Sequence, residues 1–293
     1  VGTALWHPPA IGMLSTRFPD RRAFVMSLHG IGASVGDILG PVVAGALLAF
    51  ASYQAIFKGT LVPAVVIGVL LFVIFSRMGA GKARGHSSLG DYFRALKVSA
   101  AHRPLMTSIL AGGLRSGAQI ILMAFVPIYA RSSLDLSPAL VGIMSALLLG
   151  MSLISQPLLG YYSDSIGRKK TALPGLVVLC AVTPLLGLTT GAWTLLPLVT
   201  IIGTFLFSSG LLINALGLDI APAELASSTT AAQFLAGLTF GTIGPLLAGA
   251  AGDAFGIEAT FYVATLLFAL TLILVLTLPA AEQKGKTARF AAS

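Results

Sequence analysis

The chain alternates between long apolar runs and short polar stretches. Eight runs reach roughly 20 residues, the length that an α-helix needs to cross a hydrocarbon core, and a shorter, proline-containing run covers Val1 to Ser15. The pattern predicts an all-α polytopic membrane protein. The eight runs are Ala23 to Ala51, Gly59 to Phe75, Leu105 to Ala130, Pro138 to Tyr161, Thr171 to Leu188, Leu195 to Leu218, Ala231 to Ala251 and Thr260 to Leu278.

Composition and charge agree with a membrane protein. Hydrophobic residues make up 56% of the chain and charged residues only 10%, whereas soluble domains carry roughly 25% charge. If successive runs alternate in direction, 15 of the 18 lysines and arginines fall on one side, which predicts that this side is cytoplasmic. The net charge of +8 is therefore a topology signal. We expect no nucleic-acid partner, because no soluble basic face is present.

One polar stretch between two runs has a specific composition. It reads Gly160-Tyr161-Tyr162-Ser163-Asp164-Ser165-Ile166-Gly167-Arg168-Lys169-Lys170. Glycine permits a tight reversal, and cations hold such a loop on the cytoplasmic side. The spacing resembles the loop signature of the major facilitator superfamily, G-x-L-x-D-x-x-G-R-K, with Tyr162 where that family often has an aliphatic residue. The resemblance implies two six-helix bundles, transport by alternating access, and a gating role for Gly160, Asp164, Gly167, Arg168 and Lys169.

The resemblance also gives this loop a partner. It implies that Asp164 and Arg168 stabilise the outward-facing state. It places Asp164 near the cytoplasmic start of the eleventh span, around Ser228 and Thr229. An anion is favoured there by the partial positive charge of a helix N-terminus.

An internal repeat indicates how the chain is organised. Gly40-Pro41-Val42-Val43-Ala44-Gly45 matches Gly244-Pro245-Leu246-Leu247-Ala248-Gly249 at an offset of 204 residues. Because such repeats form the two bundles of this transporter class, we expect about 100 further residues, enough for three spans, before Val1. Residues 1–76 are then the remnant of an N-terminal bundle (spans four to six) and 104–279 the complete C-terminal bundle (spans seven to twelve). Residues 77–103 form a cytoplasmic linker with an amphipathic helix, and 280–293 a cytoplasmic tail.

The repeated segments carry small residues at helical spacing. Such residues let helix backbones approach closely, and proline bends a helix. The pattern resembles the G-x-x-x-G-P-x-x-G-G segment of the superfamily's antiporters, although Ala44 and Ala248 replace the first of its paired glycines. Tight packing without a coupling role is the alternative. The packing and kink residues are Gly36, Gly40, Pro41, Gly45, Gly241, Gly244, Pro245 and Gly249.

Two titratable residues inside a run are candidates for proton coupling. Asp37 lies within the apolar run Ala23 to Ala51, where a charge costs about 3 kcal/mol on insertion scales, so it should face a cavity or a partner. His29 lies eight positions earlier, about two turns away, and histidine titrates near neutral pH. A structural ion pair for Asp37 and a packing role for His29 are the alternatives.

Several polar residues within the runs are candidates for substrate binding. Arg115 and Gln119 lie one turn apart in Leu105 to Ala130, which the resemblance makes the cavity-lining seventh span. A fixed cation there suggests an anionic or hydrogen-bonding substrate; a structural pair with Asp37, or with a group in the spans expected before Val1, is the alternative. Trp6-His7-Pro8-Pro9 resembles an element of some bacterial facilitators, including fosmidomycin-resistance-type exporters. Its Trp6 and His7 are cavity candidates, and Asn214 and Gln233 are weaker ones that could instead bond across helices.

These expectations lead to one main function and several alternatives. The main one is proton-coupled efflux of a small organic compound by a monomer in the inner membrane. Uptake of an organic anion with protons is favoured by Arg115. An intramembrane enzyme and a membrane scaffold that does not transport are remote alternatives. No cofactor or metal is expected, because no histidines or cysteines stand at metal spacing.

Overall fold

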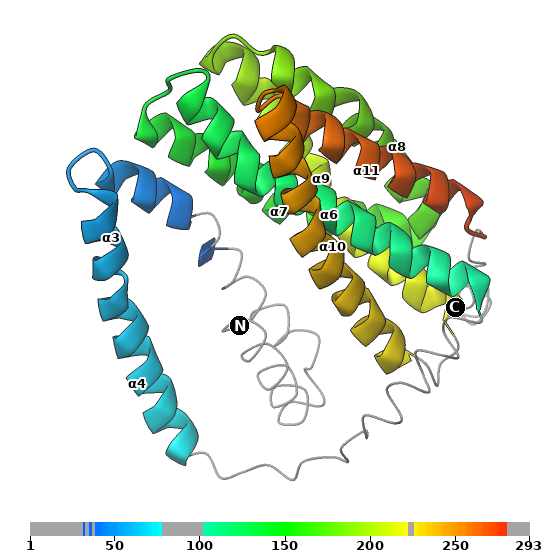
Figure 1. Cartoon of the computed structure of the whole chain (residues 1–293). Coiled ribbons are helices and arrows are strands. Elements are labelled where there is room, and N and C mark those ends of the chain that lie inside the picture. Colours follow the sequence, from blue (N-terminus) through cyan, green and yellow to red (C-terminus); the bar gives the residue numbers. More distant parts are fainter. Residues whose placement is uncertain (1–31, 33–34, 37–38, 78–101, 222–225, 280–293) are drawn as a thin grey trace.

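All the regular structure in the described part of the chain is helical (Figure 1). The structure is a computed structural model that describes residues 32, 35, 36, 39–77, 102–221 and 226–279, with the backbone alone at 75, 77, 164 and 226–228. The expected all-α fold is confirmed. The helices are α3 (Tyr53–Gly59), α4 (Leu61–Arg77), α6 (Arg103–Ser132), α7 (Pro138–Ile166), α8 (Arg168–Val182), the 3-10 helix η2 (Thr183–Leu188), α9 (Ala192–Ile220), α10 (Ala226–Phe255) and α11 (Ala259–Thr277).

Seven stretches of the described residues are long and apolar enough to cross a membrane. They match the predicted runs from Gly59 onwards, with differences at the ends. The predicted run Gly59 to Phe75 begins earlier, because Ser52 caps α3 by accepting a hydrogen bond from the Ala55 amide. The run ending at Leu188 finishes as η2, the tighter helix that often closes a longer one. Hydropathy locates a span, whereas caps and turn residues set its ends.

The sequence fixes several helix starts through capping residues. His102 Nδ1 accepts a hydrogen bond from the Leu105 amide at the start of α6, and Ser137 Oγ accepts one from the Leu140 amide at the start of α7. Both helices have proline in the first turn, where the missing N–H is not needed. These side chains satisfy backbone donors that would otherwise be orphaned where the chain enters the apolar region.

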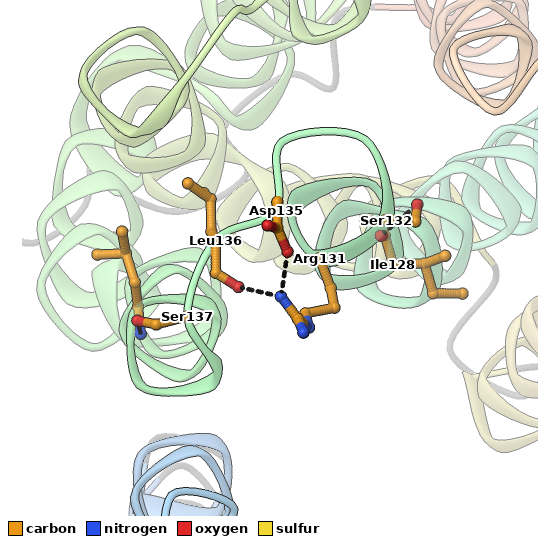
Figure 2. Close-up of polar contacts among 7 residues, drawn as sticks. Ile128, Arg131, Ser132, Asp135, Leu136 and Ser137 are labelled. Carbon is orange, nitrogen blue, oxygen red and sulfur yellow. Dashed lines mark hydrogen bonds and ion pairs between the residues drawn. The ribbon is translucent and has the colours of Figure 1, made fainter.

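The connection between α6 and α7 is held by a local ion pair (Figure 2). Arg131 Nη1 lies 2.6 Å from Asp135 Oδ1 and donates a second hydrogen bond of 3.3 Å to the Leu136 carbonyl. Asp135 adopts a φ of 47°, which an aspartate tolerates better than most residues. Both charged side chains are exposed, so their main effect is to shape this short turn.

Helix α6 is central to the second half of the chain. It packs against α9, α10 and α11, and the largest fully buried side chains include its own Ile121 and, on α11, Phe261 and Phe268. Near its end, Tyr129 packs edge-to-face on Phe261 at 5.2 Å and donates a hydrogen bond of 2.9 Å to the Thr189 carbonyl. The outward surfaces of α7, α10 and α11 expose large apolar side chains, as expected for helices that face lipid.

The first half of the chain touches the second at a close helix crossing. Helices α3 and α4 run apart from α6 to α11 (Figure 1), but residues 39–47, which are also helical, approach the start of α7. A Cβ on Gly45 would lie 2.7 Å from the Pro138 carbonyl oxygen, and one on Gly142 would lie 2.5 Å from the Pro41 carbonyl oxygen. Only glycine permits this approach at the two positions.

Gly167 makes the turn that separates α7 from α8. Its φ of 99° and ψ of 143° lie in a region that L side chains rarely adopt. The same residue ends α7, donating its amide to the Ser163 carbonyl, and begins α8, where its own carbonyl accepts from the Thr171 amide. One glycine therefore allows two spans to reverse direction without a longer loop.

We expect Gly167→Ala to destabilise the folded protein by about 1–3 kcal/mol, because the new side chain is strained in this backbone conformation. Gly160→Ala is the matched control, since Gly160 is helical and a Cβ there meets nothing within 4 Å. Thermal unfolding of the purified variants in detergent measures the difference. Equal midpoints for the two variants would contradict the assignment of strain to Gly167.

Candidate functional site

The buried cation of α6 lies against α9. Arg115 is 9% exposed, and its Nη1 donates a hydrogen bond of 2.7 Å to the Leu206 carbonyl. The Ser209 hydroxyl donates to the same oxygen at 3.0 Å. Among the described residues, no carboxylate forms an ion pair with Arg115. A backbone carbonyl thus supplies its hydrogen bond, one of the partners open to arginine inside a membrane.

Two further predicted residues, Asn214 and Gln233, lie with Arg115 along the contact of α6, α9 and α10, which we call the polar seam. The Asn214 side-chain oxygen approaches Gly112 of α6, at 3.3 Å from where a Cβ would lie. Gln233 of α10 is buried, and its Nε2 donates a hydrogen bond of 3.0 Å to the Asn214 carbonyl. The structure therefore brings Arg115, Asn214 and Gln233 together along the contact of α6, α9 and α10, although 99 residues separate the first two in sequence.

Glycines of α9 make room for the polar groups of this seam. A Cβ on Gly210 would lie 2.5 Å from Arg115 Cζ. A Cβ on Gly217 would lie 2.4 Å from Gln233 Nε2 and 2.7 Å from the Ser108 hydroxyl. These glycines were not among the predicted site residues. The seven-residue interval between them, two turns of one helix face, was the available signal.

Gln119 lies one turn beyond Arg115 on α6 and is half-buried. Its Nε2 lies 3.6 Å from the Met123 sulfur, which is a weak acceptor.

A second polar contact, which the sequence did not indicate, joins α7 to α9, where the hydroxyls of Ser155 and Ser208 lie 2.7 Å apart and are buried. The amide of Gln119 therefore keeps more unused hydrogen-bonding capacity than either serine.

The signature loop, Gly160 to Lys170, forms the end of α7, the turn at Gly167 and the start of α8, and it lies where these helices meet α9. Arg168 Nε lies 2.5 Å from Asp219 Oδ2, at the last turn of α9. Asp219 was not predicted as a site residue. The signal was present, because Asp219 is an acid just beyond a long apolar run, on the side to which the cations were assigned. For Asp164 the structure describes only the backbone, so the predicted contact of its carboxylate lies outside the described part.

Lys169 connects the same loop to the last helix. Its Nζ donates hydrogen bonds of 2.8 Å to the Leu276 carbonyl and 2.5 Å to the Leu278 carbonyl, where α11 ends. The last carbonyls of a helix have no partner within the helix and carry partial negative charge, so an ammonium group is favoured there. Neighbouring cations of one loop therefore bind the ends of two different helices.

At Thr229, in the first turns of α10, the structure shows a buried hydroxyl. Among the residues that the structure describes, its Oγ1 has no hydrogen-bond partner. Orphaned buried polar atoms are uncommon, and a free donor at a helix start favours an anion. The predicted neighbourhood of Asp164 therefore contains a hydroxyl with unused hydrogen-bonding capacity.

The glycine segment of α10 crosses α6 closely at one position. A Cβ on Gly244 would lie 3.1 Å from Gly117 Cα, so these two backbones are nearly in contact. Gly241 and Gly249 leave room for ordinary contacts with side chains of α6. Around Gly36 and Gly40, in the matching segment, a Cβ would meet no described residue within 4 Å. The two copies of the repeat therefore use their glycines against different neighbours.

Four predicted site residues cannot be placed. Trp6, His7, His29 and Asp37 lie outside the described residues. Within the described residues, no group of three or more histidine, cysteine or acidic side chains could hold a metal ion. The candidate site therefore consists of the polar seam around Arg115 and the charged contacts of the loop.

Comparisons with known proteins agree with this arrangement. The family model of the Major Facilitator Superfamily matches residues 1–241 and 109–292, so it covers nearly the whole chain. A solved structure of a variant of the E. coli fucose:proton symporter FucP is similar in fold, with a TM-score of 0.64 at 16% identity. That match covers 91% of this chain and 70% of the symporter. A search of the curated proteins gave no match.

We expect Lys169→Ala to lower the stability of the folded protein by about 1 kcal/mol, because the carbonyls that end α11 lose their cation. Lys170→Ala is the matched control, since Lys170 is the exposed neighbour on the same turn. Thermal unfolding in detergent, together with protease sensitivity just beyond α11, reports the effect. Equal behaviour of the two variants would remove Lys169 as the cap of this helix.

Proposed function

Because the chain belongs to the major facilitator superfamily, we propose that it exports a small organic compound in exchange for protons. The family is one of transporters, which sets aside the intramembrane enzyme and the scaffold. The match of the family model along the chain is the observation that carries the proposal. Without a nucleotide-binding site in the sequence, the energy comes from an ion gradient.

The orientation follows from the charges. We place the α7–α8 turn, the linker 77–103 and the tail 280–293 on the cytoplasmic side of the inner membrane, because these stretches hold most of the lysines and arginines. The crossing of Gly45 with Gly142 then lies at the outer end of the spans. In this conformation the two halves are in contact on the outside, as alternating access requires of its inward-facing stage.

The loop supplies the gating element of the proposal. Arg168 is tied to Asp219 in the C-terminal bundle, which holds the loop against α9. Asp164, on the last turns of α7, then faces the start of α10 in the outward-facing state, where the Thr229 hydroxyl, which has no partner within the described part of the chain, is available. Charge near a helix N-terminus contributes about 0.3–1 kcal/mol, enough to bias two states that are close in free energy.

A second candidate function is proton-coupled uptake of an organic anion. Arg115 favours it, because a buried guanidinium whose one hydrogen bond within the described residues goes to a carbonyl has donors left for an anionic substrate. The fold neighbour FucP is, by its name, a proton symporter. In both candidates we assign substrate contacts to Arg115, Gln119, Asn214, Gln233, Trp6 and His7, and proton coupling to Asp37 and His29.

Transport by the full-length protein in liposomes tests the proposal. We expect a proton gradient to drive movement of at least one compound of a panel of drugs and organic anions, and the direction to separate export from uptake. Asp164→Asn should slow this transport several-fold while membrane insertion stays normal. Unchanged rates in that variant would remove the loop from the mechanism, and no proton-dependent flux in the unaltered protein would overturn the proposal.

A double-mutant cycle on Arg115 and Asp37 separates binding from structure. If Arg115 binds substrate, Arg115→Gln should weaken affinity without loss of folded protein. If it pairs with Asp37, either single change strands a charge in the membrane and costs about 3–5 kcal/mol, and the double variant should recover. Folded protein and substrate affinity are scored separately. Instability rescued by the double variant would contradict the binding role.

A further inference from the structure

The guanidinium of Arg115 lies flat on the backbone of α9. A Cβ on Gly210 would be 2.5 Å from Arg115 Cζ and 2.8 Å from each of Nη1 and Nη2. An approach from the edge of the guanidinium would put a nitrogen closer than Cζ. The observed order of distances therefore means that the flat face of the group covers Gly210. This position has no room for any side chain while Arg115 keeps its place.

Because the guanidinium contacts Gly210 through its flat face, the N–H donors on its edges are not covered by this contact. Nη1 donates to the Leu206 carbonyl, and within the described part of the chain Nε and Nη2 have no acceptor. Arg115 as a whole keeps 9% of its surface exposed.

The free edge has the geometry that a carboxylate needs. Nε and Nη2 present two parallel N–H donors, and arginine binds carboxylates most strongly through such a pair. One turn further along α9, Asn214 is exposed, and its side-chain oxygen points to the same seam at Gly112. An exposed amide on this seam can bond a second polar group of a small molecule.

We infer that the Nε–Nη2 edge of Arg115 binds the carboxylate of a small organic anion and that Gly210 is the residue that determines this specificity. The inference rests on the proposed transport function, since it names the class of substrate. Gly210 acts by letting the guanidinium lie flat, so that its Nε–Nη2 edge runs alongside α9 and is not turned into the helix backbone. A side chain at 210 tilts the group and breaks the bidentate geometry without removing the charge.

The chain offers a sharp set of variants to test this. In Gly210→Ala the new methyl meets only the far end of a flexible side chain, so we expect the protein to fold. In Gly237→Ala the methyl makes an ordinary contact with the Ser116 hydroxyl, 3.5 Å away, and serves as the control. In Gly203→Ala the methyl would lie 2.7 Å from the Leu147 carbonyl oxygen of α7, so loss of folded protein is expected there.

The experiment measures binding to the purified full-length protein rather than transport. The probes are acetate, benzoate and citrate, each compared with its neutral amide, and binding is followed by calorimetry. We expect at least one carboxylate to bind at least tenfold more tightly than its amide, since a charge-assisted pair is about twice as strong as a neutral one. Gly210→Ala and Arg115→Lys should each weaken that binding about tenfold, whereas Gly237→Ala should leave it unchanged.

Three results would overturn the inference. They are no carboxylate binding by the unaltered protein, equal carboxylate affinity in Gly210→Ala and Gly237→Ala, and retained affinity in Arg115→Gln. These results are distinguishable from failure of the proposed function. Proton-driven transport by a protein that binds no carboxylate would overturn the anion site alone, whereas a protein that binds carboxylates without moving any compound would overturn the transport function alone.

Discussion

The structure depends on one constraint, which is that a polar group inside a lipid bilayer has no water to bind. Helices satisfy the backbone, and along α9 the hydroxyls of Thr200, Thr204 and Ser208 each donate to the carbonyl four residues earlier. The same constraint explains why Arg115 bonds a backbone carbonyl of a neighbouring helix. A polar side chain that is kept under this constraint has either such a local partner or a function.

Glycine allows polar side chains to fit between the helices while the helices stay closely packed. Gly210 and Gly217 provide space on α9 for the guanidinium of Arg115 and the amide of Gln233, while Gly117 and Gly244 bring α6 and α10 into backbone contact. In a membrane there is little hydrophobic gain from bringing apolar helices together, so close packing and hydrogen bonds must hold the bundle. The glycines therefore serve packing and the polar seam at once.

Charge is concentrated where the helices end. Arg168 and Lys169 bind, respectively, the acid at the last turn of α9 and the final carbonyls of α11. The first turn of α8 thus joins the ends of helices that are far apart in sequence. Because an ion pair that is partly exposed contributes little to stability, the effect of Arg168 and Asp219 is to fix where the loop lies. That position is what a gating role for Asp164 requires.

The sequence by itself determined the fold class, the number and approximate limits of the spans from Gly59 onwards, and the family. Run length, charge asymmetry and the Gly160–Lys170 loop are local properties of the sequence. In a bilayer, the length of an apolar run predicts a spanning helix and the lysines and arginines predict which turns are cytoplasmic. The sequence also singled out Arg115, because a charge in an apolar run is costly wherever it points. The domain division and the residues before Gly32 stay predictions.

Only the tertiary structure decided which residues meet. Nothing in the sequence pairs Arg168 with Asp219, 51 positions away, or places Gly210 under Arg115, because such contacts depend on how the helices are rotated and how far each is shifted along its neighbour. Hydrophobicity is similar on most faces of a buried membrane helix, so a period in the sequence does not fix that rotation. The polar seam forms because α9 packs with the face that carries Gly210 and Gly217 toward Arg115 and Gln233.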